Sequence, residues 1–131
     1  MTIKRVLNIE DTMTKHVAIV RALQKCGIRN IDHATTAMEG LTKIELAIEE
    51  GNPYSVVVSD MYFPIFPGER MTDAGMYVIE ELENRNIDIP IIVCSSVRLN
   101  IPKVVGCIYY NELRGDLDGD MRAMIEKVRN L

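Results

Sequence analysis

The sequence predicts an α/β fold, a doubly wound parallel sheet with helices on both faces. Short apolar runs alternate along the chain with longer segments whose apolar residues recur at helical spacing. The short runs are apolar nearly throughout, as in strands that helices cover on both sides. A length of 131 residues, of which 47% are hydrophobic and 26% charged, excludes a mainly disordered chain. We therefore expect a single domain over residues 1–131.

Strands are predicted where a short apolar run ends at polar residues. The expected strands are Val6–Ile9, Ile31–Ala34, Val56–Val58, Ile91–Cys94 and Val104–Tyr109. The third run consists only of β-branched residues, which favour extended backbone. Repeated strand–helix order places such strands in parallel.

Helices are predicted in the segments between these strands. The first carries an apolar stripe of Met13, Val17, Ile19, Val20, Leu23 and Cys26 and ends before Gly27. The second starts with Thr36 and Glu39 at capping-box spacing, and it buries Ala37, Leu41, Ile44 and Ile48.

Two more helices are predicted in the second half of the chain. The third buries Met76, Val78, Ile79 and Leu82. The last buries Met121, Met124, Ile125, Val128 and Leu131, with Asp118 or Asp120 as the expected N-cap.

Polar residues follow several of the predicted strands, namely Glu10-Asp11, Asp60 and Ser95-Ser96. In a parallel sheet these strand ends share one edge, where ligands bind. Clustered carboxylates repel one another, and Mg²⁺, which prefers oxygen ligands, would relieve this. One carboxylate could then attack phosphorus while a hydroxyl bonds the new phosphoryl group. Alternatively, Glu10, Asp11 and Asp60 cap loops or helices independently.

Charge and cysteine content narrow the possible partners. The formal net charge of −4 and the absence of basic clusters argue against direct nucleic-acid binding. No apolar run approaches the roughly 18 residues of a membrane span, and no signal-peptide pattern is visible, so we expect no membrane insertion. The three cysteines are widely spaced in apolar contexts, which favours free thiols and a cytoplasmic location.

The polar strand ends form part of a wider pattern. Pro64 comes four residues after Asp60, Gly75 opens the next helix, and Ser95 comes five residues after Pro90. Together with Glu10-Asp11, this pattern resembles the receiver domains of two-component response regulators. The resemblance covers essentially the whole chain, and it implies the flavodoxin-like strand order 2-1-3-4-5.

The resemblance also implies roles for individual residues. Asp60 corresponds to the phosphoacceptor, Asp11 to a direct Mg²⁺ ligand, and Glu10 to an acidic partner acting through water. The backbone carbonyl of Tyr62 corresponds to another metal ligand, and Ser95 to the switch hydroxyl. The relay aromatic of the family matches Cys107, with Tyr109 nearby.

The implied function is that of a phosphoacceptor signalling module and not an enzyme. At most it would phosphorylate itself from small donors and dephosphorylate itself. Its expected partners are a sensor histidine kinase or phosphotransfer protein and a downstream protein that it contacts directly.

The sequence departs from the family pattern at the fifth strand. Counting from Gly106, Tyr110 stands where the family has a Lys, and Asn111 stands at the following Pro. The missing ammonium removes a charge that would pair with phosphate. Lys103 lies upstream of the strand, and we do not expect it to substitute.

Two segments also differ in length from the family pattern. The loop Met61–Ala74 is long and apolar, so it is either a lid or docking surface, compatible with a homodimer, or packs on the domain itself. The interval between Ser95 and Gly106 is short and contains Pro102, so we expect a shortened or missing fourth helix.

Two other functions remain open at this point. A pseudo-receiver, an interaction module without phosphorylation-dependent switching, is favoured by Tyr110 and the shortened region of the fourth helix. A small Mg²⁺-dependent phosphatase could use Asp60 as nucleophile. Haloacid-dehalogenase-type enzymes, however, have a second Asp two residues later, where this chain has Tyr62.

Overall fold

The computed structural model describes residues 1–113 and 115–131. Its main sheet runs in the order β2-β1-β3-β6-β7 with all neighbours parallel. The strands are β1 (Val6–Ile9), β2 (Ile31–Ala34), β3 (Val56–Ser59), β6 (Ile91–Ser95) and β7 (Gly106–Tyr109). Counted along this sheet alone, the order is 2-1-3-4-5, so the predicted topology is confirmed.

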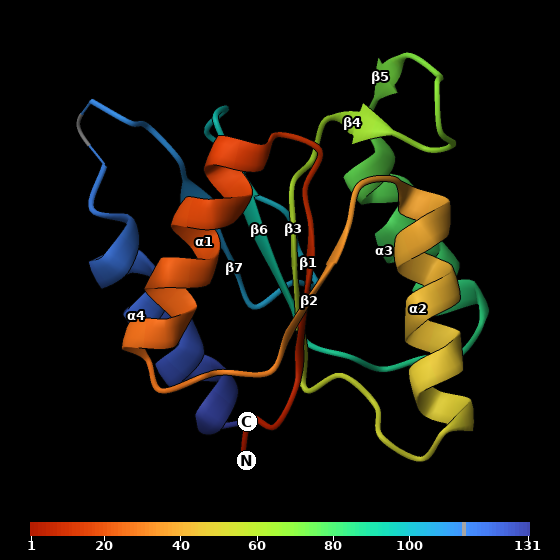
Figure 1. The fold of residues 1–131 in the computed structure, drawn as a ribbon, viewed down its shortest axis with the longest axis horizontal. Coiled ribbons are helices and arrows are strands. Elements are labelled where there is room, and N and C mark those ends of the chain that lie inside the picture. The colour runs from red at the N-terminus through yellow and green to blue at the C-terminus, as the bar shows by residue number, and fades with distance from the viewer. Residues whose placement is uncertain (114) are drawn as a thin grey trace.

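Helices cover both faces of the sheet (Figure 1). On one face lie α1 (Met13–Lys25) and α4 (Leu117–Arg129), and on the other α2 (Ala37–Glu49) and α3 (Ala74–Asn84). Successive side chains along a strand point into two different cores. Leu7 and Ile9 pack toward α2 and α3, and Val6 packs toward α1 and α4. Each fully buried aliphatic side chain stabilises the fold by about 1.5–3 kcal/mol. This burial on both faces is the physical reason for the continuous apolar runs.

The helix faces differ from the prediction at several residues. Met13 and Val17 are 57% and 41% exposed, so their placement on the buried face of α1 was wrong. Lys15 is buried instead, together with Ile19, Ala22 and Leu23. Ile48, predicted to lie on the inner face of α2, is also exposed. Leu131, predicted to lie on the buried face of the last helix, is exposed because α4 ends before it.

The helix caps were partly predicted. Thr36 caps α2, and its hydroxyl accepts from the Glu39 N–H, as predicted, while the Glu39 carboxylate accepts from the N–H of Thr35. The N-cap of α4 is Asp116, whose carboxylate accepts from the Gly119 N–H, so the prediction of Asp118 or Asp120 was wrong. Asp116 lies closer to the chain turn that precedes the helix and can therefore reach the free N–H groups of the first turn.

The segment between β6 and β7 is irregular. Residues 96–105, all of which the structure describes, contain no helix. The helix that was predicted to be shortened or missing between the fourth and fifth strands of the main sheet is therefore absent here. The strand that follows begins at Gly106 and not at Val104 as predicted.

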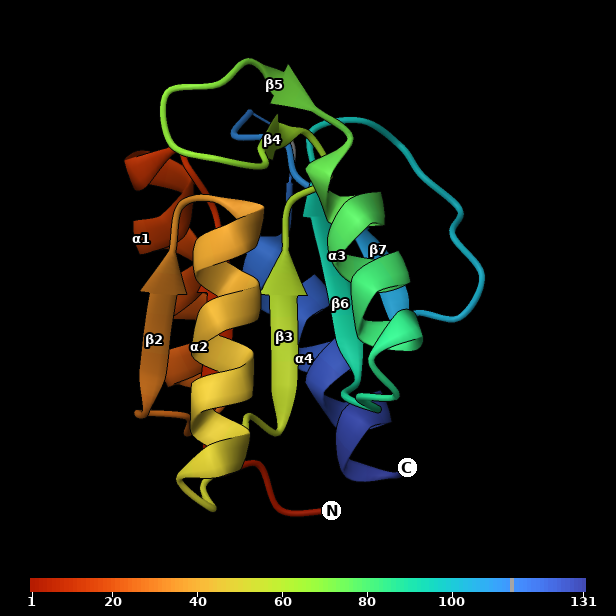
Figure 2. The same cartoon turned by 90° about the vertical axis from the view of Figure 1, so that its right-hand side faces the viewer.

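The long loop after β3 folds into a small antiparallel hairpin of β4 (Phe63–Pro64) and β5 (Met71–Thr72), beyond the carboxyl end of β3 (Figure 2). Phe63 is fully buried, and the Met38 N–H donates to the carbonyl of Ile65. This part of the loop packs on the domain itself. The outer part of the loop is accessible to solvent, since the side chains of Phe66 and Met71 are exposed.

A polar cluster joins β1, β2 and the loop before β3. Two guanidinium nitrogens of Arg5 donate to Oδ2 of Asp32 at 3.1 and 2.8 Å, and the Tyr54 hydroxyl donates to the same oxygen at 2.7 Å. Burial raises the pKa of Asp32, but the hydrogen bonds from Tyr54 and Arg5 outweigh burial and leave that pKa below its ordinary value.

We predict that Tyr54→Phe lowers the free energy of unfolding by about 1 kcal/mol at pH 7. The lowered pKa of folded Asp32 means that its contribution is present above the unfolded pKa of about 4 and is lost as the pH falls through the folded pKa. Urea unfolding at pH 7 and pH 3 should therefore give a smaller difference from wild type at pH 3. Tyr77→Phe, which removes only a 3.8 Å contact to the Met38 sulfur, is the control. An equal Tyr54→Phe effect at both pH values would contradict the prediction.

Candidate functional site

The parallel register brings the polar strand ends together. Ile9 of β1 lies beside Ser59 of β3, and the Asp60 N–H donates to the Ile9 carbonyl at 3.0 Å. The residues that follow these strands therefore share one edge of the sheet. Glu10, Asp11 and Asp60 form an acidic cluster, in which one carboxylate oxygen from each lies within 4.8 Å of the others.

The carboxylates of this acidic cluster differ in environment. Glu10 is fully buried, and the Thr12 N–H donates to its Oε2 at 3.2 Å. Burial raises the pKa of Glu10 to about 7; the positive charge of Lys15 opposes this shift and the negative charge of Asp60 adds to it. Asp60 is partly exposed, and its Oδ1 accepts from the Met61 N–H at 2.7 Å. Asp60 is thus the more accessible of the two.

A buried lysine that sequence reasoning did not select reaches the acidic cluster from α1. The Lys15 Nζ lies 2.9 Å from Oε1 of Glu10 and 3.2 Å from Oδ1 of Asp60. It also donates to the Cys94 carbonyl, at the end of β6, at 2.7 Å. Burial lowers the pKa of Lys15, but the charges of Glu10 and Asp60 raise it more, so the side chain stays protonated.

The sequence did contain a signal for Lys15. It lies four residues before Ile19, and therefore on the same face of the helix as Ile19 and Leu23. A lysine on the buried face of a helix requires a compensating charge. The acidic strand ends were the available source of that charge.

A cavity of about 370 Å³ opens beside the acidic cluster, and we call it the site cavity. Its lining includes Asp11, Asp60, Tyr62, Ser96 and Tyr110. Tyr62, whose backbone carbonyl the resemblance makes a metal ligand, is among the residues that line this cavity.

The two serines after β6 have different environments. Ser95, the predicted switch hydroxyl, is 1% exposed, and its Oγ accepts from the Val97 N–H at 3.2 Å. Ser96 is exposed and lines the site cavity. The hydroxyl at the cavity wall is thus one residue further along the chain than the predicted one.

Tyr110 stands where the resemblance places a family lysine. The Lys15 Nζ lies 5.5 Å from the centre of the Tyr110 ring, within the range of a cation–π contact. Lys103 is exposed and pairs with Glu83 at 2.7 Å, so it does not substitute at the site, as expected.

The two residues considered for the relay lie on β7. Cys107 is half-buried and packs against the core on the α2 and α3 side. The Tyr109 ring carries the Arg98 guanidinium at 4.2 Å from its centre.

Two histidines support the backbone behind Glu10. The rings of His16 and His33 stack at 3.6 Å, and Nε2 of His33 lies 2.7 Å from the Glu10 carbonyl oxygen. Burial, and then the neighbouring His33, lower the pKa of His16. Through this stack and the contact of His33 with the Glu10 carbonyl, the two histidines hold the end of β1 in place.

The donor set of the acidic cluster fits a hard divalent cation. Three carboxylates converge, and carboxylate oxygens are the ligands that Mg²⁺ prefers. Oε1 of Glu10 is buried and accepts no well-aligned hydrogen bond within the described residues. This oxygen has an ion pair with the Lys15 ammonium but no such hydrogen bond, so it still has a lone pair with which it could bind a metal cation.

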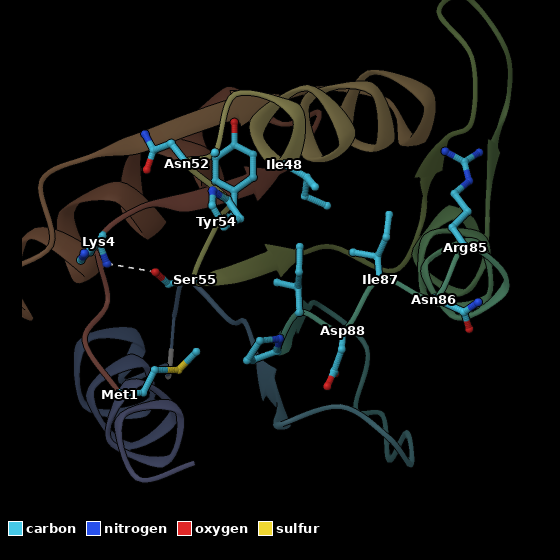
Figure 3. A pocket seen from close by; sticks show the side chains of 14 residues that line it. Met1, Lys4, Ile48, Asn52, Tyr54, Ser55, Arg85, Asn86, Ile87 and Asp88 are labelled. Atoms are coloured by element: carbon cyan, nitrogen blue, oxygen red, sulfur yellow. Dashed lines mark hydrogen bonds between the residues drawn. The ribbon is translucent and has the colours of Figure 1, made fainter.

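A larger cavity, of about 730 Å³, lies at the opposite end of the sheet (Figure 3). Its lining comes from the segments that precede β1, β3 and β6, and includes Lys4, Tyr54, Ser55 and Asp88. The Lys4 N–H already donates to the Ser55 hydroxyl at 3.0 Å. The acidic cluster lies elsewhere, so the smaller site cavity is the better candidate for chemistry.

No family model and no curated protein matches the sequence. Solved structures do match. A two-component response regulator from Cytophaga hutchinsonii is 14% identical with a TM-score of 0.75, and all of both chains is covered. The response regulator TrrA from Thermotoga maritima, solved with Mg²⁺ and BeF, is 20% identical with a TM-score of 0.70, over 95% of this chain and 98% of that one.

A third similar structure is the chemotaxis response regulator CheY4 of Vibrio cholerae. It is 16% identical with a TM-score of 0.68, and the match covers 97% of this chain and 99% of that chain. Among the described residues, no helix is both long and apolar enough to cross a membrane. The strand order, the helices on both faces and these matches agree, and the chain therefore has the fold of response-regulator receiver domains.

Proposed function

We propose that residues 1–131 form one receiver domain that accepts a phosphoryl group on Asp60 with Mg²⁺. The observation that carries the proposal is the position of Asp60. Its carboxylate lies at the wall of the site cavity, beside two further carboxylates and a protonated lysine. An accessible nucleophile surrounded by fixed charges is the arrangement that phosphoryl transfer needs.

In the proposed reaction an Asp60 carboxylate oxygen forms a bond to phosphorus. The bond that breaks joins phosphorus to an imidazole nitrogen in a phosphohistidine donor, or to a carboxylate oxygen in acetyl phosphate. The electron pair of that bond leaves with the donor, as acetate in the case of acetyl phosphate. Glu10, Asp11, Asp60 and the Tyr62 carbonyl would hold Mg²⁺, which supplies charge stabilisation of the transferring group. The Mg²⁺–BeF complex of TrrA supports this assignment.

The proposed donor is a sensor histidine kinase or a phosphotransfer protein, and the proposed output is contact with a downstream protein. Both follow from the fold that this chain shares with response regulators. Ser95 remains the proposed switch hydroxyl, although Ser96 lies nearer to the cavity opening. A cytoplasmic location is part of the same proposal.

A pseudo-receiver is the second candidate, and one observation favours it. Lys15 already bridges Glu10 and Asp60, so the acidic cluster has a cation of its own. A module that no longer switches could keep this pair for structure alone. Such a module need neither bind Mg²⁺ nor take up phosphoryl groups.

Intact-protein mass spectrometry tests the proposal. We expect wild type to gain one phosphoryl group from acetyl phosphate in the presence of Mg²⁺ and none after removal of the metal. Asp60→Asn should abolish the gain, whereas Asp88→Asn, at an exposed carboxylate beside the opposite cavity, should leave it intact. Uptake that persists in Asp60→Asn would reject Asp60 as the acceptor. No uptake by wild type, together with no Mg²⁺ binding, would establish the pseudo-receiver.

A further inference from the structure

We infer that Lys15 is the ammonium that binds the phosphoryl group on Asp60, supplied by α1. This inference rests on the proposed function and extends it to a residue for which the sequence pattern implied no role. The chain lacks a lysine at Tyr110, and the Lys15 Nζ lies beside that tyrosine and beside the Asp60 carboxylate.

The geometry already places the ammonium at the predicted reacting group. The Lys15 Nζ lies 3.2 Å from Oδ1 of Asp60, and it is also held by Glu10 at 2.9 Å and the Cys94 carbonyl at 2.7 Å. The contact with the Cys94 carbonyl is a hydrogen bond, and the contacts with the Glu10 and Asp60 carboxylates are ion pairs. The side chain is only 7% exposed, which keeps water from competing strongly for the charge.

Phosphorylation changes the third of these partners. The Asp60 carboxylate becomes an acyl phosphate, and its negative charge moves outward to the phosphoryl oxygens, which carry about −1.5 to −2. The ammonium can keep its hydrogen bond to the Cys94 carbonyl and its ion pair with Glu10 while it turns from Asp60 toward a phosphoryl oxygen. The side chain needs only a small rotation for this, because it already lies against the acceptor.

A purely structural role explains the lysine poorly. Burying an ion pair costs desolvation, and an apolar side chain of similar size is often as stable. The corresponding position lies one turn before Ile19 on the buried face of α1, where leucine or methionine would pack. The charge is therefore better explained by the group that it faces in the site cavity.

Lys15 and a divalent cation draw on the same carboxylate oxygens, and this gives the inference a distinctive test. Removing the ammonium leaves the carboxylate oxygens of Glu10 and Asp60 without a competing cation, so Mg²⁺ should bind more tightly. The same change removes a donor to the transferring phosphoryl group, so uptake should slow. A structural defect would weaken both properties together.

The experiment compares Lys15→Gln, Lys15→Arg and Lys25→Gln with wild type. Lys25 lies on the same helix but is exposed and pairs with Asp118, so its replacement is a matched loss of charge away from the site. Mg²⁺ affinity is measured by calorimetry, and the rate of phosphoryl uptake from acetyl phosphate by mass spectrometry. For Lys15→Gln we expect uptake to slow about tenfold and Mg²⁺ to bind several-fold more tightly. Lys15→Arg should lie between Lys15→Gln and wild type, and Lys25→Gln should match wild type.

The possible results separate this inference from the proposed function. Wild-type uptake that Lys15→Gln leaves unchanged would overturn the role of Lys15 and leave the proposed function standing. A wild type that takes up no phosphoryl group would overturn both. If Lys15→Gln does not fold, Glu10→Gln is compared with the double variant Glu10→Gln/Lys15→Met, which removes the buried pair together. A further tenfold loss of uptake in the double variant supports the inference, and equal rates overturn it.

Discussion

Replacing Phe63 with alanine should lower the free energy of unfolding by about 3–5 kcal/mol. Phe63 is fully buried, and it is among the largest buried side chains in the part of the chain that the structure describes. It extends from the hairpin into the core between the sheet, α2 and α3. Truncation would leave a cavity that neighbours such as Met61 fill only in part.

Phe66 is the matched control for this prediction. It belongs to the same loop but is 49% exposed, so Phe66→Ala should change the free energy of unfolding by less than about 0.5 kcal/mol. Urea unfolding followed by circular dichroism measures both variants. Equal losses from Phe63→Ala and Phe66→Ala would show that the hairpin does not share the core of the domain.

The second large effect is expected at Gly75, in the first turn of α3. A Cβ at this position would lie 2.6 Å from the Asp60 carbonyl oxygen and 2.8 Å from Cα of Met61. Both are backbone atoms, and the Gly75 N–H also donates to the Met61 carbonyl at 2.9 Å. We expect Gly75→Ala to cost about 3 kcal/mol, because the backbone that carries Asp60 has to move. Phosphoryl uptake should fall in the same variant.

Gly106 provides the comparison. A Cβ there would meet the sulfur and terminal methyl of Met124 at 2.5 and 2.7 Å, and these are the far end of a flexible side chain. Gly106→Ala should therefore cost less than about 1 kcal/mol. Thermal unfolding of both variants measures the difference. A Gly75→Ala protein as stable as Gly106→Ala would show that the contact at Asp60 relaxes without strain.

Much of the fold could be predicted because strands that are buried on both faces of the sheet have continuous apolar sequences. Val56–Val58 and Ile91–Cys94 are continuous apolar runs, and both form central strands. The acidic cluster could also be predicted, since the residues that follow parallel strands must share an edge. Glu10, Asp11 and Asp60 do meet there.

The remaining features depend on tertiary contacts that periodicity does not encode. The side chain of Lys15 is buried because three oxygens at the ends of β1, β3 and β6 converge on it. Only the end of β1 is near Lys15 in sequence. Ser95 and Ser96 are neighbours, and the direction of the chain after β6 decides which of the two hydroxyls faces the site cavity. Met13 and Val17 lie at helical spacing from each other, but on the face of α1 opposite to the buried face that carries Lys15.

The irregular segment 96–105 changes how strain can travel through the molecule. A helix at this place would act as a rigid rod that carries a displacement at one end to a surface several turns away. An irregular segment lacks such a rigid axis, so it carries a displacement less far along the chain. A movement that starts at the Cys94 carbonyl would therefore shift only nearby groups, namely Ser96, Arg98 and the Tyr109 ring. A binding partner would have to contact that neighbourhood directly to detect it.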